Sequence, residues 1–328
     1  MSGWLPSAPC TPRHCARHPG RAGRARSLAR LVAGIVAVLS GVLLAPLTAP
    51  LRPAARRRLT RLWCRTVIRA FGVRVRVVGT PAHGPHLVVA NHVSWLDIPL
   101  VAAVLPGRML AKSEVRTWPV LGPLAARGGT LFVERDRLRA LPGTVRDLAR
   151  ALGDGSPVVV FPEGSTWCGR AQGHFRPAAF QAALDAGAAV QPVRISYHPT
   201  GPAAFVGDDP LAASLWRVAA ARGLTAEIRI LPPIPAGSHT DRRSLARAAQ
   251  TAVRTAVRTT HRTADPTTGR IPVQRTEGTA LRATDRTTDR EAAVHTAVAS
   301  DSANLPSPSV HQCASSIPAP ASSRRTPS

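Results

Sequence analysis

A histidine and an aspartate five residues apart are the first candidates for chemistry in this chain. His92 and Asp97 belong to the stretch NHVSWLD, which directly follows the apolar run 87–90. Five residues of regular helix turn by about 140°, so a continuous helix would hold the two side chains apart. Pro99 limits the helix, however, because proline is tolerated in a first helical turn but not deeper. The helix is therefore predicted to begin near 95–97, which leaves His92 in a loop from which its imidazole can reach the Asp97 carboxylate.

Such a pair has the chemistry of a general base. A carboxylate that accepts a hydrogen bond from one imidazole nitrogen fixes the tautomer and leaves the other nitrogen free to take a proton. The alternative is that Asp97 caps the helix, because Ser94 three residues earlier completes a capping-box pattern. A nucleophilic Ser94 is disfavoured because the chain contains no G-x-S-x-G motif. These residues alone leave the catalytic pair and the helix cap open.

Three further sites place polar side chains after apolar runs. Glu163, Gly164 and Ser165 form a turn in FPEGSTW that suits a polar or phosphate-bearing ligand, with a plain solvent-facing turn as the alternative. Arg135 follows the run LFVE, and its planar guanidinium suits a phosphate. Lys112 is the only lysine in the chain, which hints at a need for an ammonium group but is equally explained by chance.

Apolar runs and amphipathic stretches alternate through the middle of the chain. This alternation predicts an α/β fold, with a largely parallel sheet flanked by helices. Ligands bind such sheets beyond the carboxyl ends of the strands, where the polar motifs stand. Strands are predicted at 73–79, 87–90, 109–111, 131–134, 158–161, 190–197 and 226–231, and helices at 56–71, 98–105, 138–152, 175–186 and 242–261.

The segment 28–70 is predicted to be helical and associated with a membrane, ahead of a domain at 71–261. Residues 31–51 carry no charge, and as a helix they would extend about 30 Å, enough to cross a hydrocarbon core. A membrane anchor or re-entrant helix, a cleaved signal peptide and a buried helix all fit this stretch. The basic helix 56–71 would lie on a membrane surface or pack on the domain. Arginines flank both ends of the apolar stretch, so they define no orientation.

Both ends of the chain are predicted to be disordered, because residues 1–27 are rich in Arg, Pro and Gly and residues 262–328 in Thr, Arg, Ala, Ser and Pro. The formal net charge is +25, and residues 1–96 contain fifteen arginines and no acidic residue. Such a surface favours an anionic partner, such as lipid headgroups or an acidic carrier. Nucleic acid is disfavoured because the chain has no zinc-finger spacing or RNP-like motif.

The cysteines indicate neither a metal site nor a disulfide framework. They are odd in number and scattered, and no two form a CxxC pair. A reducing compartment is the simplest interpretation of Cys10, Cys15, Cys64, Cys168 and Cys313.

Together, the motifs resemble those of the lysophosphatidate acyltransferase family of glycerolipid acyltransferases. The family pattern N-H-x4-D matches NHVSWLD, G-x-x-F-[IV]-x-R matches GTLFVER, and F-P-E-G-[TS] matches FPEGS. A fourth block, an apolar-Pro-Val element, corresponds to VQPV at 190–193. The four blocks follow the family's order within residues 75–235.

The resemblance implies an acyltransferase with the family's domain fold, in which His92 is the general base and Asp97 its partner. Glu163 would hold a glycerol hydroxyl or anchor Arg135, because a carboxylate beside a phosphate would repel it. The lone lysine would aid binding. The residues implied to bind the acceptor lipid are Lys112, Arg135, Glu163, Gly164 and Ser165.

The implied reaction moves a fatty acyl group from acyl-CoA or acyl-carrier protein to the free hydroxyl of a lysophospholipid. The foremost acceptor is 1-acylglycerol-3-phosphate, which would become phosphatidic acid. The reaction needs no metal, other cofactor or nucleophilic side chain, because one base, orientation and stabilisation of the oxyanion suffice. The enzyme would work at the cell membrane among membrane lipids, with its catalytic domain on the cytoplasmic side.

One motif departs from the family's common pattern. Many members continue F-P-E-G-T-R-S, whereas this chain has Ser165, Thr166 and Trp167. Arg170 or Arg176 would replace the missing arginine, or the acceptor differs. Members that act on lyso-ornithine lipid share the His-x4-Asp core, and residues 205–218 resemble that group. A non-catalytic membrane- or nucleic-acid-binding protein is the alternative from another functional class.

Overall fold

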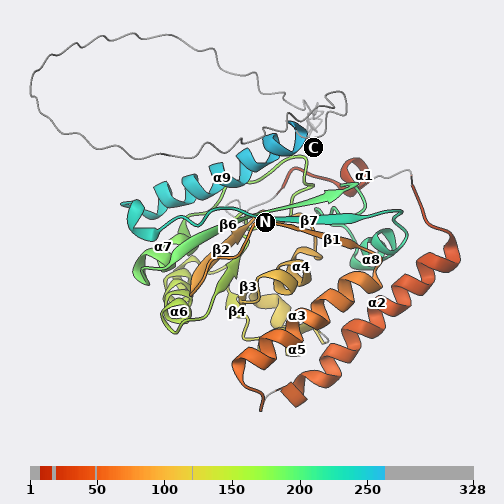
Figure 1. Cartoon of the computed structure of the whole chain (residues 1–328), viewed down its shortest axis with the longest axis horizontal. Helices are drawn as coiled ribbons and strands as arrows, with labels where there is room; N and C mark the ends of the chain where they lie inside the picture. The colour runs from red at the N-terminus through yellow and green to blue at the C-terminus, as the bar shows by residue number, and fades with distance from the viewer. Residues whose placement is uncertain (1–7, 17–19, 49, 120, 263–328) are drawn as a thin grey trace, which may run out of the picture. The chain divides into compact units, whose positions relative to one another are not determined.

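A seven-stranded sheet forms the centre of the domain, with the strand order β1-β7-β6-β2-β5-β3-β4 (Figure 1). The computed structural model describes residues 8–16, 20–48, 50–119 and 121–262. All neighbouring strands run parallel except β6 and β7, which are antiparallel. The expected α/β fold with a largely parallel sheet is thus confirmed. The strands are β1 (Arg74–Val78), β2 (His86–Ala90), β3 (Arg108–Lys112), β4 (Leu131–Val133), β5 (Val158–Val160), β6 (Ala189–His198) and β7 (Thr225–Ile230).

Helices cover both faces of this sheet, so its central strands are apolar on both sides. Every residue of β2 and of β5 is buried. Successive residues of β2 face opposite cores, as the two-residue period of a strand requires: Leu87 and Val89 belong to one core cluster, Val88 and Ala90 to the other. Burial on both faces explains why these strands appear in the sequence as uninterrupted apolar runs.

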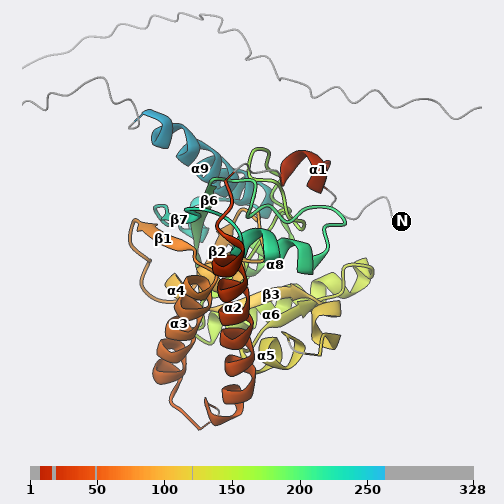
Figure 2. The same cartoon turned by 90° about the vertical axis from the view of Figure 1, so that its right-hand side faces the viewer.

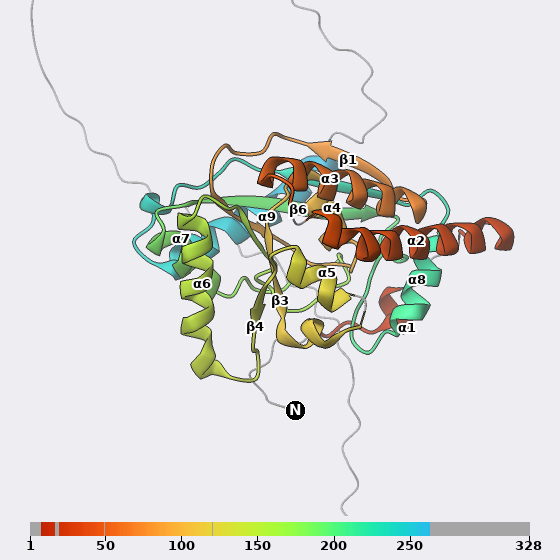
Figure 3. The ribbon, with the colours of Figure 1, turned by 90° about the horizontal axis from the view of Figure 1, so that it is seen from below.

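One core lies under α6 (Leu141–Gly153), α7 (Ala178–Asp185) and α9 (Arg242–Arg262), and the other under α3 (Pro53–Ala70), α4 (Asp97–Val104) and α8 (Leu211–Ala219). Figures 1 and 3 show α6 and α7 next to each other and away from α2 (Arg24–Leu44) and α8. The buried stripe of α9 follows the helical period, with Leu245, Ala249 and Val253 four residues apart. The shorter helices are α1 (Pro12–Cys15), η1 (Ala45–Thr48), η2 (Ser113–Thr117), α5 (Leu121–Arg127), η3 (Leu138–Ala140) and η4 (Ala236–Ser238).

The apolar segment packs against the basic helix through small residues. Figures 1 and 2 show α2 and α3 side by side. A side chain at Gly34 or Gly41 would collide with the rings of Phe71 and Trp63, respectively, and the Trp63 indole donates a hydrogen bond of 2.7 Å to the Ala37 carbonyl. The large apolar side chains of this segment point the other way and are exposed, namely Leu28, Val32, Ile35, Val36, Leu39, Leu43, Leu44 and Leu47.

The same segment is the one stretch of the described residues that is long and apolar enough to cross a bilayer, judged by length and composition alone (Arg24–Thr48). Its helix begins at Arg24, four residues before the predicted start at residue 28, and changes at Ala45 into a 3-10 turn that contains Pro46. Proline removes a backbone donor, so the α-helix cannot run on to Leu51 as the uncharged stretch indicated.

The expectation of disorder over 1–27 is wrong for the described part of that segment. Residues 12–15 form α1, and the Ala22 backbone N–H donates a 2.8 Å hydrogen bond to the Ala220 carbonyl. Cys10 is buried against residues 204 and 206. These contacts with residues about 150–200 positions away order a segment whose own composition favours disorder. The predicted disordered tail from residue 263 onward lies outside the described residues.

Candidate active site

The carboxyl ends of four parallel strands bring the predicted site residues to one edge of the sheet. His92 follows β2, Glu163 follows β5, Lys112 ends β3 and Arg135 follows β4. Because β2, β5, β3 and β4 are consecutive neighbours in the sheet, their following loops lie in the same order.

His92 and Asp97 are in direct contact. Nδ1 of His92 lies 2.8 Å from Oδ2 of Asp97. A carboxylate oxygen is an acceptor, so Nδ1 carries the proton in the neutral imidazole and Nε2 is left with a free lone pair. The ring stacks on Phe161, with 4.2 Å between the ring centroids, and its side chain keeps 19% exposure. The arrangement gives a base that is fixed in orientation and still reachable by a substrate.

Asp97 is fully buried and accepts four hydrogen bonds. Besides the imidazole, Oδ2 accepts from the backbone N–H groups of Val93 at 2.6 Å and Ser94 at 2.9 Å. Oδ1 accepts from the Tyr197 hydroxyl at 2.6 Å. The burial of a carboxylate costs several kcal/mol unless its oxygens find donors, and here each oxygen has at least one.

Asp97 contacts His92 and also lies at the start of α4, the two roles that the sequence had left open. Asp97 is the first residue of α4 and reaches back to the Ser94 N–H, as the acidic residue of a capping box does, while Ser94 Oγ accepts from the Leu96 N–H at 3.2 Å. The turn at 95–96 thus bends the chain so that His92 also reaches Asp97. The carboxylate thus orients the imidazole and closes the turn before α4, whose own N-cap, Leu96, makes no side-chain cap.

Asn91 joins the histidine loop to the neighbouring strand β6. Its side-chain amide donates to the Ile195 carbonyl at 2.9 Å, and its side-chain oxygen accepts from the Ile195 N–H at 2.8 Å. This double hydrogen bond continues the β2–β6 pairing by one residue past Ala90. It holds the loop where the first motif begins.

Glu163 is placed differently from what the sequence led us to expect. Its carboxylate is buried and accepts hydrogen bonds from the backbone N–H groups of His92 at 2.9 Å and Gly173 at 3.2 Å. These contacts brace the histidine loop, and among the described residues no ion pair joins Glu163 to Arg135. The expected anchoring of Arg135 by Glu163 is therefore wrong, because both carboxylate oxygens are turned inward to backbone donors.

Burial raises the pKa of Glu163 to about 7, despite the two backbone hydrogen bonds that lower it. The nearby Asp97 raises the pKa further and Arg194 lowers it. A carboxyl group with this pKa changes its protonation within the ordinary working range of an enzyme.

Arg135 is held by the turn instead. Its guanidinium donates a 2.7 Å hydrogen bond to the Gly164 carbonyl, and its side chain is half-buried. Gly164 has φ +72°, a conformation that residues with a Cβ rarely adopt, so the turn requires glycine here. Ser165 follows in the same turn and is half-buried. The same turn therefore contacts both functional residues: Glu163 binds the backbone of His92, and the Gly164 carbonyl binds Arg135.

Lys112 lies on the Arg135 side of this edge. Its ammonium is 5.8 Å from the centroid of the Trp118 ring. The Glu114 carboxylate accepts hydrogen bonds from the Glu114 backbone N–H and from the Ser113 hydroxyl. These bonds, together with the charges of Lys112 and Arg135, hold the pKa of Glu114 below its usual value. Among the described residues, Lys112 forms no hydrogen bond or ion pair with the site around His92, so the lysine belongs to the outer part of the site.

Two residues of the site were missed from the sequence. Tyr197 is the only tyrosine of the chain and stands at the end of a predicted strand, which is the one signal that marked it. Trp167 was noted only as a departure from the family pattern, yet its backbone N–H donates a 2.8 Å hydrogen bond to the His92 carbonyl. The backbone of His92 is therefore held at both its N–H and its C=O by the turn after β5.

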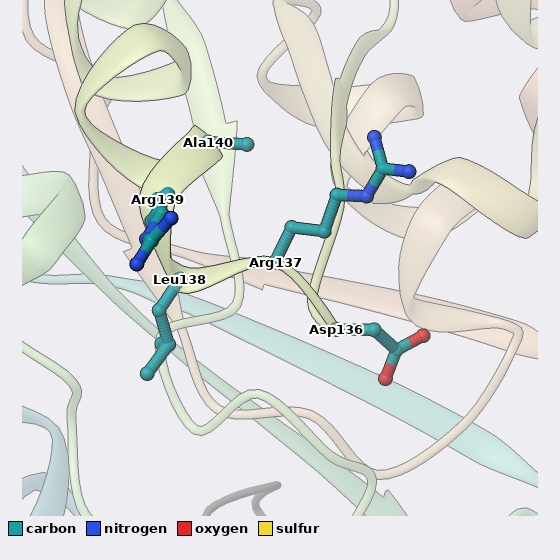
Figure 4. A pocket seen from close by; sticks show the side chains of 5 residues that line it. All are labelled: Asp136, Arg137, Leu138, Arg139 and Ala140. Atoms are coloured by element: carbon teal, nitrogen blue, oxygen red, sulfur yellow. The ribbon is translucent and has the colours of Figure 1, made fainter.

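The residues that follow Arg135 in the sequence line a hollow of about 590 Å³. Five consecutive residues line it, and Figure 4 shows Asp136 and Arg137 extending away from Leu138 and Arg139. Arg137 is exposed and lies 3.5 Å from the Glu134 carboxylate. The hollow is open to solvent, and Arg137 and Arg139 are among the residues that line it.

Comparison with known proteins gives consistent matches. Residues 74–196 match the protein family described as Acyltransferase. A lyso-ornithine lipid O-acyltransferase from Pseudomonas aeruginosa is 43% identical over 201 residues, which cover 60% of this chain and 77% of that protein. A 1-acyl-sn-glycerol-3-phosphate acyltransferase from Neisseria gonorrhoeae is 38% identical over 175 residues, which cover 51% of this chain and 69% of that protein.

A solved structure has the same fold. The crystal structure of the 1-acyl-sn-glycerophosphate acyltransferase from Thermotoga maritima aligns with a TM-score of 0.58 and 21% sequence identity, covering 72% of this chain and 95% of that one. This similarity supports the arrangement of the sheet and its covering helices.

The hydrogen bond from Tyr197 to Asp97 predicts a specific loss. In Tyr197→Phe the buried carboxylate keeps three donors, and we expect the free energy of unfolding to fall by about 1.5–3 kcal/mol. We also expect turnover in an acyl-transfer assay to fall about tenfold with little change in KM, because the imidazole loses its fixed orientation. Ser214→Ala is the matched control, since it removes the 3.2 Å hydrogen bond from the Trp95 indole elsewhere in the core. Equal turnover in both variants would contradict a positioning role for Tyr197.

The pKa of Glu163 predicts a pH dependence of stability. With a folded-state pKa of about 7 against an ordinary value of 4.5, the native state binds more protons than the unfolded state between these values. Stability from this group is therefore lost as pH rises through that window, by about 3 kcal/mol at most. Urea unfolding between pH 5 and 8 should show a steeper decline for the wild type than for Glu163→Gln. Glu134→Gln, at an exposed side chain, controls for the loss of one charge, and parallel wild-type and Glu163→Gln curves would exclude the effect.

Proposed function

This chain belongs to the lysophosphatidate acyltransferase family, and we propose that it transfers a fatty acyl group from a thioester to the free hydroxyl of a lysolipid. The observation that carries the proposal is the 2.8 Å contact between His92 Nδ1 and Asp97, which leaves Nε2 free on a partly exposed imidazole. Such a nitrogen can take a proton from an alcohol, whose oxygen is otherwise a weak nucleophile.

The proposed reaction is a direct transfer. Nε2 of His92 removes the hydroxyl proton while the lysolipid oxygen attacks the thioester carbonyl. The tetrahedral intermediate collapses, the new ester forms, and the thiolate leaves and takes the proton from the imidazolium. Asp97 keeps the ring in position throughout, and its carboxylate stabilises the imidazolium charge. The donor is acyl-CoA or acyl-carrier protein, both of which are anionic and suit the basic chain.

Arg135, Gly164 and Ser165 are proposed to bind the headgroup end of the acceptor. Arg135 is bound to the Gly164 carbonyl through one guanidinium nitrogen only, so its other N–H groups can meet an anionic group. Glu163 acts from behind the turn, where it fixes the backbone of His92 and does not touch the lipid. Lys112 extends the cationic side of the site away from the base.

Two acceptors are each favoured by a specific observation. The motif residues and Arg135 favour 1-acylglycerol-3-phosphate, which would give phosphatidic acid. The absence of an arginine after Ser165 and the 43% identity to the Pseudomonas aeruginosa relative favour lyso-ornithine lipid. We expect lyso-ornithine lipid to be the better acceptor, because the third motif lacks the second cation that a phosphate dianion would use.

We also propose that the enzyme works on a membrane, on the cytoplasmic side, where both candidate donors are found. The exposed apolar side chains of α2 would enter the lipid. Beside them, α3 presents a hollow lined by Ala54, Arg57, Arg58, Arg61, Leu62 and Arg65. Arginines next to an exposed apolar face suit a surface of anionic lipid headgroups.

An assay with both donors and both acceptors tests the function. Purified wild-type protein in detergent should form a diacyl product, with the higher kcat/KM for lyso-ornithine lipid. His92→Ala should lower turnover by at least about 100-fold with an unchanged circular dichroism spectrum, because the base is lost. His83→Ala, at an exposed histidine, is the control. Near wild-type turnover of His92→Ala would contradict the mechanism, and no product from any combination would favour a non-catalytic lipid-binding protein.

Membrane binding can be tested with vesicles. Wild-type protein should bind phosphatidylglycerol-containing vesicles more tightly than pure phosphatidylcholine vesicles. Replacement of Arg57, Arg61 and Arg65 by Gln should weaken binding to the anionic vesicles at least tenfold, at about 1 kcal/mol per arginine. The matched control replaces Arg243, Arg247 and Arg254 of α9 by Gln, which removes the same amount of positive charge from a different helix. Equal weakening in both variants would exclude α3 as the contact surface.

A further inference from the structure

Three cysteine sulfurs lie together at the side of the domain where the N-terminal segment packs. The sulfur atoms of Cys10, Cys15 and Cys168 are all within 4.8 Å of one another. Cys10 and Cys168 are buried, and Cys15 is half-buried. The sequence indicated no such cluster, because Cys168 is more than 150 residues from the other two.

Local backbone structure presents each of these sulfurs. Cys10 precedes α1 and Cys15 ends it, so one helical turn, started by Pro12, brings the two together. Cys168 stands before Gly169, which has φ +81° and turns the chain back.

Apolar packing alone is the simpler explanation for buried cysteines, since a thiol behaves as a small apolar group. Residues 204 and 206 do complete a small apolar cluster around Cys10 and Cys168. That explanation accounts for burial but not for three sulfurs that converge on one point. A disulfide would join two of them and leave the third without a role.

The spacing suits a tetrahedral metal. Zinc–sulfur bonds of about 2.3 Å in tetrahedral geometry place thiolate sulfurs about 3.8 Å apart. All three pairs here are within 4.8 Å, so small side-chain rotations would bring them to that spacing. Of the residue types present, thiolates are the ligands that zinc prefers.

We propose that Cys10, Cys15 and Cys168 bind one zinc ion as three thiolates, with a water molecule in the fourth position on the exposed side of Cys15. Binding releases the three thiol protons to solvent, and the complex carries one net negative charge. Arg13 in α1 and Arg170 beside Cys168 supply positive charge in the surrounding sequence.

The ion would fasten residues 8–16 to the turn that follows the third motif. Cys168 is the next residue after Trp167, whose N–H holds the His92 carbonyl. A metal here would be a structural clamp one residue from a hydrogen bond of the candidate base, and it would take no part in acyl transfer. The inference therefore stands or fails independently of the proposed function.

Metal analysis of the full chain tests the site. Wild-type protein purified under reducing conditions with added zinc should retain close to one zinc per chain after gel filtration. Cobalt(II) substitution should give the intense visible bands and the thiolate-to-metal charge-transfer bands of a tetrahedral thiolate site. Cys10→Ser, Cys15→Ser and Cys168→Ser should each weaken zinc binding at least tenfold in a chelator competition, because each removes one ligand.

Cys64→Ala is the matched control, because Cys64 is buried in the other core between α3 and the sheet. It should bind zinc as the wild type does. Cys10→Ser and Cys15→Ser lie on the N-terminal segment, so an unchanged circular dichroism spectrum separates loss of a ligand from failure to fold. Wild-type protein without stoichiometric zinc, or serine variants that bind zinc equally well, would overturn the proposal. A mass spectrum with a disulfide between two of these cysteines and no bound metal would also overturn it.

Discussion

Removing the Asp97 carboxylate from water is unfavourable unless donors replace its hydration, and the surroundings of the loop supply them. Two donors come from the loop's own backbone, one from the His92 ring and one from Tyr197 on β6. The need to satisfy one buried charge therefore fixes the loop, the start of α4 and the imidazole at once. The orientation of the base follows from the same set of hydrogen bonds that makes the buried charge tolerable.

A second constraint is the parallel sheet, which determines where side chains from distant motifs meet. His92 and Glu163 follow adjacent parallel strands, so the turn after β5 can hold the backbone of the histidine loop at both N–H and C=O. Glu163 acts as a brace whose polar contacts are internal. This explains how a carboxylate can stand in a motif assigned to an anionic headgroup without repelling it.

Sequence periodicity predicted the sheet and most of its covering helices. The polar motifs that follow apolar runs predicted where the site lies. Pro99 showed that His92 could reach Asp97, but only the resemblance of the later motifs to the family favoured the pair over a helix cap. Contacts between residues far apart in the sequence could not be predicted in this way. Tyr197 donates a hydrogen bond to Asp97, 100 residues away, and Cys168 lies near Cys10 only in the folded chain. Helices α1, α5 and α8 were not predicted; α1 and α5 are only four and seven residues long, too short to show a helical period.

The hydrogen bonds between Asn91 and Ile195 span 104 residues, and they have a consequence for the order of assembly. At about 5–20 residues per second, a ribosome needs roughly 5–20 s to make that interval. During this time β2 exists without the neighbour that secures its loop, while the apolar helix α2 has already been synthesised. The long apolar helix is therefore synthesised well before the residue that holds the histidine loop, so the active site can only be completed after the N-terminal segment has left the ribosome.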